Sequence, residues 1–131
     1  MYSIRAAAGL LILPLVLIAC TTGGEPTAAA PFATYDRSRP GVGDAALMTA
    51  TLVMDRGCLY ADGDGQRWLP VFPAAATEWD AAARTLTVDG RTVALGRSTE
   101  LGGGTARAEI ITSAPQGCDR SRIWLVVSVG T

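Results

Sequence analysis

The side chains that could do chemistry in this chain are carboxylates and cysteines, because the sequence contains no histidine and no lysine. Without histidine, nucleophilic triads with an imidazole base and histidine-based zinc sites are excluded. Without lysine, Schiff-base chemistry and the lysine-containing phosphate loop are excluded as well. The remaining catalytic device is a pair of carboxylates that divide the roles of acid and base. The acidic residues considered for it are Glu78, Asp80, Glu100 and Glu109.

These carboxylates form no pattern that identifies a reaction, and acidic residues on solvated faces are the ordinary condition of a folded domain. The run Asp62–Gly65 also fails as a calcium loop, which needs glycine at position six and glutamate at position twelve. Counting from Asp62 places Arg67 and Pro73 at these positions. We therefore predict a turn at Asp62–Gly65, and we expect no catalytic residue, no metal and no cofactor.

Three tryptophans offer aromatic surface, which often lines ligand sites. Trp124 lies inside the apolar final segment, so we expect it in the core. Trp68 and Trp79 are the better candidates for a ligand-binding face.

The first twenty residues are typical of an export signal. One positive charge at Arg5 precedes an apolar stretch, Ala6–Ile18, of about 13 residues. A membrane-spanning helix needs roughly 20 residues, whereas the hydrophobic part of an export signal is shorter. The stretch ends in Leu17-Ile18-Ala19-Cys20, which resembles the lipobox of bacterial lipoproteins.

That resemblance implies that the Cys20 thiol receives a diacylglyceryl group, that the leader 1–19 is removed, and that the new N-terminus is acylated, for example with palmitate. Two or three acyl chains anchor durably where a single chain holds only marginally. Thr21 follows the cysteine, where lipoproteins retained in the Gram-negative inner membrane often have aspartate, so the resemblance favours the outer membrane in such a cell. The alternatives are a true membrane helix or a buried helix with a chance cysteine.

Once Cys20 is lipidated, Cys58 and Cys118 remain in an oxidising compartment, where only one pairing exists. Metal ligation is the competing interpretation, but two isolated thiols without histidine make a poor zinc site. A redox-active pair would more naturally be a close Cys-x-x-Cys. A structural disulfide between Cys58 and Cys118 is therefore favoured.

The composition divides the mature chain into a tether and a domain. Residues 20–43 are rich in glycine, proline, alanine and threonine, which is typical of a flexible tether. We expect Phe32 and Tyr35, which lie in this range, to remain undocked. Residues 44–131 form the predicted β-domain.

The domain is predicted to be all-β, with about six short strands separated by turn signals in a small barrel or sandwich, an OB-like barrel included. Asp89-Gly90 predicts a type I′ hairpin that places Val88 opposite Arg91 and Leu86 opposite Val93. Gly102–Gly104 predicts a bulge or bend. The alanine-rich segment Ala74–Arg84 predicts one or two helical turns. Strand-like segments are Leu47–Met54, Cys58–Tyr60, Gln66–Phe72, Arg97–Leu101, Arg107–Thr112 and Ile123–Val129.

A second resemblance covers Arg56 to Val127. The pattern RGCLY…LPVFP…W…LTVDGRTVALG…ELGGG…GC…IWLV resembles a group of small, mostly uncharacterised bacterial exported or lipid-anchored β-domain proteins. The resemblance implies an envelope location and a disulfide, and it carries no activity and no catalytic residues.

The net charge of the chain limits the kinds of partner that it can bind. The formal net charge is −1 and becomes about −2 once a leader containing Arg5 is removed, so nucleic acid, which needs a concentrated basic field, is excluded as a partner. We expect a lipid-anchored envelope protein that binds another envelope protein or a small ligand without catalysis. The alternatives are a carboxylate-dependent hydrolase and a purely structural envelope component.

Overall fold

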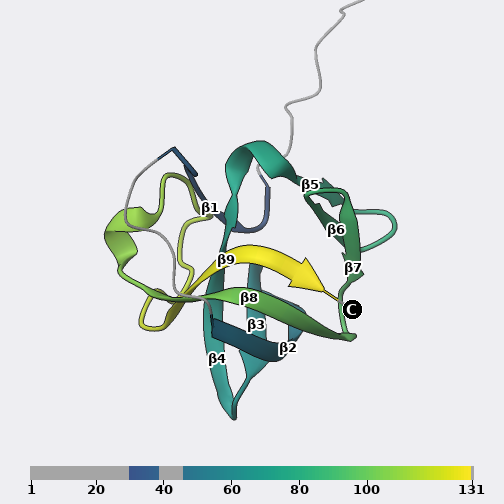
Figure 1. Ribbon diagram of the computed structural model, residues 1–131, viewed down its shortest axis with the longest axis horizontal. Coiled ribbons are helices and arrows are strands. Elements are labelled where there is room, and N and C mark those ends of the chain that lie inside the picture. The colour runs from purple at the N-terminus through teal and green to yellow at the C-terminus, as the bar shows by residue number, and fades with distance from the viewer. Residues whose placement is uncertain (1–29, 39–45, 131) are drawn as a thin grey trace, which may run out of the picture.

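The computed structural model describes residues 30–38 and 46–130, and these ranges confirm the all-β fold (Figure 1). The predicted leader, Cys20 and most of the predicted tether lie outside the described residues. In chain order the elements are β1 (Ala33–Tyr35), β2 (Ala46–Asp55), β3 (Cys58–Gly63), β4 (Gln66–Pro73), the 3-10 helix η1 (Ala74–Ala76), β5 (Thr77–Asp80), β6 (Thr85–Val88), β7 (Arg91–Ala94), β8 (Ser98–Ala106), the 3-10 helix η2 (Ala108–Ile110) and β9 (Ile123–Gly130).

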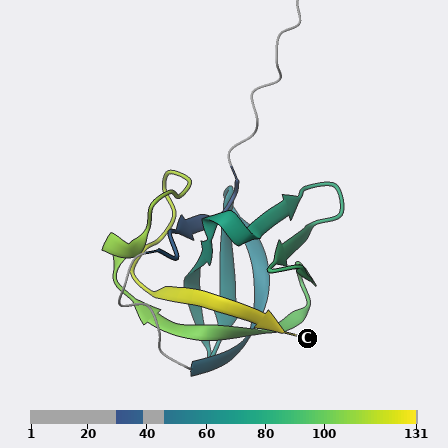
Figure 2. The same cartoon turned by 45° about the horizontal axis from the view of Figure 1, so that its top comes forward.

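The larger sheet has six strands in the order β1-β4-β3-β2-β8-β9, and the five strands other than β1 give it a barrel-like shape. β2, β3 and β4 follow one another as an antiparallel meander, and β8 returns to pair with β2. The order β8-β2-β3-β4 is that of a Greek key. β9 then pairs with β8 on one side and, in parallel, with β4 on the other, so that the sheet curls round on itself (Figures 1 and 2). Of the predicted architectures, the OB-like barrel, a partly open Greek-key barrel of five strands, describes this sheet better than a sandwich does.

Two-residue turns fix the register of three strand pairs. Each turn consists of a non-glycine residue and a glycine, both with positive φ, as a type I′ hairpin requires. At the β6–β7 turn, Val88 pairs with Arg91 and Leu86 with Val93, which confirms the predicted register. The three turns are Arg56-Gly57, Asp64-Gly65 and Asp89-Gly90.

The apolar side chains pack in two clusters, one on each face of the curled sheet. β3 contributes to both, because successive residues of a strand point to opposite faces: Leu59 and Ala61 face inward, whereas Cys58 and Tyr60 face outward. The inner cluster includes Met48, Leu52, Leu59, Phe72, Leu86, Leu101, Trp124 and Val126. The outer cluster, against which part of the segment 107–122 packs, includes Tyr35, Tyr60, Leu69, Val71, Ile123 and Leu125.

β1 corrects the predicted start of the domain. Phe32 and Tyr35 are only 4% and 1% exposed, so the expectation that they remain undocked is wrong. β1 pairs in parallel with the end of β4, and the Tyr35 hydroxyl donates a hydrogen bond of 2.9 Å to the carbonyl of Val126. Residues 30–38, predicted as tether, therefore pack with the β-domain, because the burial of two aromatic rings offsets the entropy of fixing a short segment.

A second sheet, in the order β5-β6-β7, packs its apolar side chains into the inner cluster. Its first strand replaces the helix predicted for Ala74–Arg84: only Ala74–Ala76 form a 3-10 turn, and Thr77–Asp80 are extended. Trp79 pairs with Leu86 and packs against the inner cluster. This tertiary contact outweighs the helix propensity of the alanines, which is weak in so short a segment.

The glycine run lies inside β8 and forms the predicted bulge. Gly102 is opposite Ser128 and Gly103 is opposite Val126, so Val127 has no counterpart on β8. Gly103 has a φ of +154°, and a Cβ atom there would overlap the carbonyl oxygen of Leu125. Only glycine fits this position.

The segment after β8 is not the strand predicted for Arg107–Thr112. It makes one 3-10 turn and then runs beside β1, which it contacts through two backbone hydrogen bonds of 2.8 Å. Thr34 donates to the carbonyl of Ser113 and accepts from the N–H of Thr112. The segment thereby holds β1 against the sheet.

Candidate functional site

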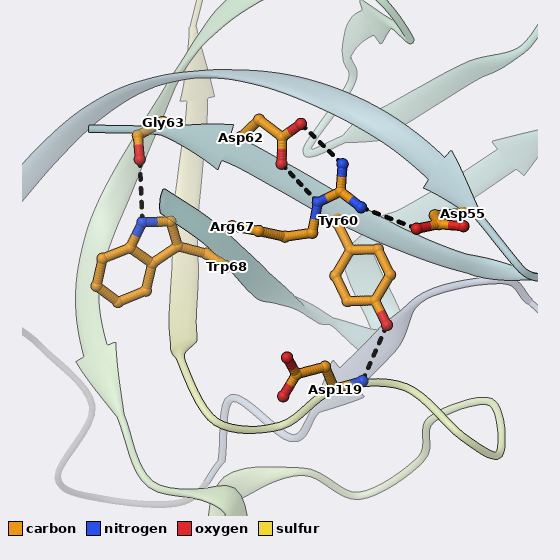
Figure 3. A network of polar contacts seen from close by, with 7 residues as sticks. All are labelled: Asp55, Tyr60, Asp62, Gly63, Arg67, Trp68 and Asp119. Atoms are coloured by element: carbon orange, nitrogen blue, oxygen red, sulfur yellow. Dashed lines mark hydrogen bonds and ion pairs between the residues drawn. The ribbon is translucent and has the colours of Figure 1, made fainter. Parts of the chain in front are cut away.

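An arginine held between two aspartates lies on the outer face of β2, β3 and β4 (Figure 3). Arg67 donates through Nε and Nη2 to both carboxylate oxygens of Asp62, over 2.7 and 3.0 Å, and through Nη1 to Asp55 Oδ2 over 2.9 Å. Its guanidinium carbon lies 5.3 Å from the centroid of the Tyr60 ring, within the range of a cation–π interaction. We call the surface formed by Asp55, Tyr60, Asp62 and Arg67 the Arg67 face.

Tight turns and strand alternation place these four residues. The Asp64-Gly65 turn sets a register in which Asp62 is directly opposite Arg67, and directly opposed residues share one face of a sheet. Tyr60 lies two residues before Asp62 and therefore on the same face. Asp55 is the last residue of β2.

The Tyr60 side chain connects the Arg67 face to the segment 107–122. Its hydroxyl accepts a hydrogen bond of 2.9 Å from the backbone N–H of Asp119 (Figure 3). Cys58, two residues before Tyr60, forms a disulfide with Cys118, the neighbour of Asp119. The Tyr60 ring, against which Arg67 packs, is thus held by its hydroxyl group and by the backbone next to the disulfide. Less side-chain entropy is then lost when a ligand binds there.

The ion pair fixes the charges of this face. Hydrogen bonds from Arg67 hold the pKa of Asp62 below its ordinary value of 3.8, and the hydrogen bond to Asp62 raises the pKa of Arg67. Both groups stay charged near neutral pH. The pair therefore presents a constant charge pattern near neutral pH.

The chemistry left to the Arg67 face is hydrogen bonding. A guanidinium has five N–H donors, and Asp62 and Asp55 use three of those on Arg67. The remaining two have no acceptor among the described residues, and the Arg67 side chain is 43% exposed, so an outside acceptor can reach them. Two carboxylates for one guanidinium disfavour a polyanion, so the face suits neutral hydroxyl, carbonyl or amide groups.

Replacement of Arg67 by glutamine is expected to return the pKa of Asp62 toward 3.8, because the hydrogen bonds that favour its ionised form are lost. In the wild-type chain the stabilisation from this pair is present above pH 3.8 and is lost as the pH falls through the lower, folded-state pKa. An NMR titration of the Asp62 carboxyl measures the shift. Asp89 is the internal control, because its lowered pKa depends on Arg37; an unchanged Asp62 midpoint in Arg67→Gln would contradict the assignment.

The two tryptophans predicted to form a ligand face lie in different sheets, on β4 and β5. Trp68 donates through Nε1 to the carbonyl of Gly63 over 3.3 Å and makes an edge-to-face contact with Trp124, with ring centroids 5.7 Å apart. Both Trp68 and Trp79 are half-buried against the inner cluster. Trp124 is buried, as expected. A ligand face that joins Trp68 and Trp79 stays a prediction.

The four candidate carboxylates are distributed over three elements. Glu78 and Asp80 are exposed on one face of β5, Glu100 lies on β8 and Glu109 on η2. Asp80 accepts a hydrogen bond of 3.0 Å from the backbone N–H of Ala83 and so stabilises the turn after β5. Within residues 30–38 and 46–130, no cluster of three or more acidic, cysteine or histidine side chains is arranged to hold a metal ion.

The disulfide between Cys58 and Cys118 is confirmed, with a Cα–Cα distance of 5.7 Å. It joins β3 to the segment 107–122, so it closes the long connection over the outer cluster. Cys20, the predicted site of lipid attachment, lies outside the described residues.

No sequence motif marks Tyr60 or Arg67 as a site residue. The usable signal is the Asp64-Gly65 turn, because a two-residue hairpin loop places Arg67 opposite Asp62. The contact from Arg67 to Asp55, twelve residues away, has no comparable local signal.

Comparison with protein-family models, curated proteins and solved structures found no match to the chain. None of the described helices is long and apolar enough to cross a membrane. The residues described above are therefore the basis for a function.

Proposed function

We propose that this chain is a lipid-anchored protein of the cell envelope whose β-domain binds a partner through the Arg67 face and catalyses no reaction. The anchor is Cys20, acylated after removal of the leader 1–19, and in a Gram-negative cell the membrane is the outer one. The partner is another envelope protein or a small ligand.

One observation carries the proposal for the Arg67 face: its charged and aromatic groups are already fixed before a partner arrives. Arg67 is held by Asp55 and Asp62 and packs on a tyrosine that is itself hydrogen-bonded. Binding surfaces gain affinity when the ordering of side chains has taken place beforehand. Arginine and tyrosine are also residue types enriched at interface hot spots.

The fold supports the same surface by analogy. OB-fold proteins bind ligands on the face of their second and third strands, flanked by the loops after the first and fourth strands. In this chain the second and third barrel strands are β3 and β4, and the flanking connections are the β2–β3 turn and the segment 107–122. The analogy concerns the position of the face, since folds do not determine ligands.

The cysteine pair supports the proposed location. Structural disulfides persist in secreted and envelope compartments and are rare where thiols are kept reduced. The Cys58–Cys118 bond therefore agrees with export from the cytosol. The leader, which resembles that of lipoproteins, would direct this export.

The proposal is tested by photo-crosslinking in living cells grown with radiolabelled palmitate. The photoreactive residue replaces Thr51, which is opposite Asp62 on the neighbouring strand. The expected result is a palmitate-labelled chain crosslinked to one discrete neighbour or ligand. Cys20→Ala should abolish the label, and Arg67→Ala should keep the label but lower the crosslinked product about tenfold, as expected for a hot-spot arginine.

A photoreactive residue in place of Glu78, exposed on β5, is the matched control and should give no such product. Persistent labelling of Cys20→Ala overturns the anchor. Equal crosslinks from both positions, unaffected by Arg67→Ala, indicate a purely structural component instead. Turnover of an envelope substrate that disappears in Glu78→Gln or Asp80→Asn would favour the carboxylate-dependent hydrolase.

A further inference from the structure

A groove runs along the outer edge of β7, away from the Arg67 face. Three adjoining hollows of about 360, 240 and 320 Å³ share lining residues and follow one another along this strand. One wall is β7, with Thr92 and Val93, and the other is formed by Gly130 at the end of β9 and Thr99 on β8. Figures 1 and 2 both show β9 ending close to β7. The groove therefore follows the edge of β7.

The main chain of β7 is unpaired on the side that faces this groove. In the described residues β7 pairs with β6 alone. The tight turn makes Val88 and Arg91 a hydrogen-bonded pair, and the pattern alternates along an antiparallel ladder. The N–H and C=O of Thr92 consequently point away from β6, and neither makes a backbone hydrogen bond to another described residue. An edge of this kind is a template for one more extended strand.

The two hollows lined by Thr92 contain arginine side chains and no carboxylate. Arg91 and Arg97 line the groove and are exposed. Neither makes an ion pair with a described residue, whereas Arg37 and Arg67 do. Asp89 and Glu100 line the third hollow, which also contains Leu47 and Ser128. Asp89 is paired with Arg37, and the Glu100 carboxylate lies beside Gly130. The part of the groove next to Thr92 therefore attracts a segment with carboxylates.

We propose that this groove binds an extended, acidic peptide segment of a partner protein as an additional strand on β7. The peptide exchanges main-chain hydrogen bonds with Thr92, and its carboxylates pair with Arg91 and Arg97. Main-chain pairing supplies affinity in strand addition, and side-chain contacts supply specificity.

Charge excludes a second copy of this chain as the preferred occupant. Two β7 strands paired edge to edge would bring Arg91 and Arg97 of each copy close to those of the other. Like charges across a strand pair are destabilising. An acidic strand has the complementary charge and meets no such cost.

Titration of the purified chain with a fluorescein-labelled six-residue peptide of alternating glutamate and valine tests the proposal. We expect saturable binding, followed by fluorescence anisotropy, that weakens as salt is added because ion pairs are screened. The variant with Arg91→Glu and Arg97→Glu should bind at least about tenfold more weakly. Thr92→Pro, which removes the N–H at a tolerated edge position, should also lose binding.

The control variant Arg120→Glu changes the same charge on the segment 107–122, outside the groove, and should bind like the wild type. A peptide N-methylated on every residue has no main-chain N–H to donate on either edge, and its failure to bind the unaltered chain supports the proposal even if a variant misfolds. Equal binding of both peptides, unchanged binding by the charge-reversed variant, no binding, or dimerisation through β7 would each overturn it. Arg67→Ala should leave this binding intact, so the outcome is independent of the Arg67 face.

Discussion

Gly103→Ala is expected to lower the free energy of unfolding of the domain by at least about 4 kcal/mol. Two effects combine at this position. Its φ of +154° is unfavourable for any residue with a Cβ atom, and the added Cβ would overlap the carbonyl oxygen of Leu125 on the neighbouring strand. Small domains have about 5–15 kcal/mol of stability in total, so the variant is expected to lose a large share of it. Urea unfolding followed by circular dichroism measures the loss.

The matched control is Gly57→Ala, in the β2–β3 turn. Gly57 also has a positive φ, +80°, but a Cβ atom there has no neighbour within 4 Å. Only the unfavourable backbone conformation then affects stability, so we expect Gly57→Ala to lower the free energy of unfolding by about 1 kcal/mol. The difference between the two variants measures the close approach of β8 and β9 at the bulge. A Gly103→Ala chain as stable as Gly57→Ala would show that the two strands separate easily.

Removal of the disulfide is the second large effect. Cys58 and Cys118 are 60 residues apart, and the entropy of closing a loop of this length corresponds to about 4 kcal/mol. We expect Cys58→Ala combined with Cys118→Ala to lower the free energy of unfolding by about that amount. The measurement is urea unfolding in a Cys20→Ala background, which leaves a single cysteine pair in the chain.

The control for this experiment is the Cys20→Ala chain that keeps Cys58 and Cys118, measured after reduction with dithiothreitol. It should match the double alanine variant, because both lack the crosslink and keep the remaining contacts of the segment 107–122. A reduced chain as stable as the oxidised one would mean that the hydrogen bonds of Thr34 and Tyr60 already hold this segment. The crosslink would then contribute little to stability.

Local chemistry explains which parts of the fold were predictable. Asp89-Gly90 determines its own hairpin because both residues accept positive φ, and the glycine run marks a bulge because only glycine tolerates the approach at Gly103. The pairing of Cys58 with Cys118 follows from an even count of the remaining cysteines. Each of these features depends on a few residues whose types leave little choice.

Contacts between distant segments explain what could not be predicted. β1 pairs with β4, almost forty residues later in the chain, and its composition is that of a linker. Trp79 packs in a strand although alanines surround it in the sequence. Only half of the Arg67 face could be predicted from the sequence. The Asp64-Gly65 turn places Arg67 opposite Asp62, but the contacts of Asp55 with Arg67 and of Tyr60 with Asp119 depend on the completed barrel.

The way β1 is fastened has a mechanical consequence. A force pulling on the chain before residue 30 reaches β3 through the hydrogen bond from Leu59 to the carbonyl of Pro31, and the segment 107–122 through Thr34. These two parts are the ones that the covalent bond between Cys58 and Cys118 joins. Under the proposed lipid attachment, part of the tension would therefore enter the domain where a sulfur bridge resists extension. The rest would pass to β4, with which β1 pairs.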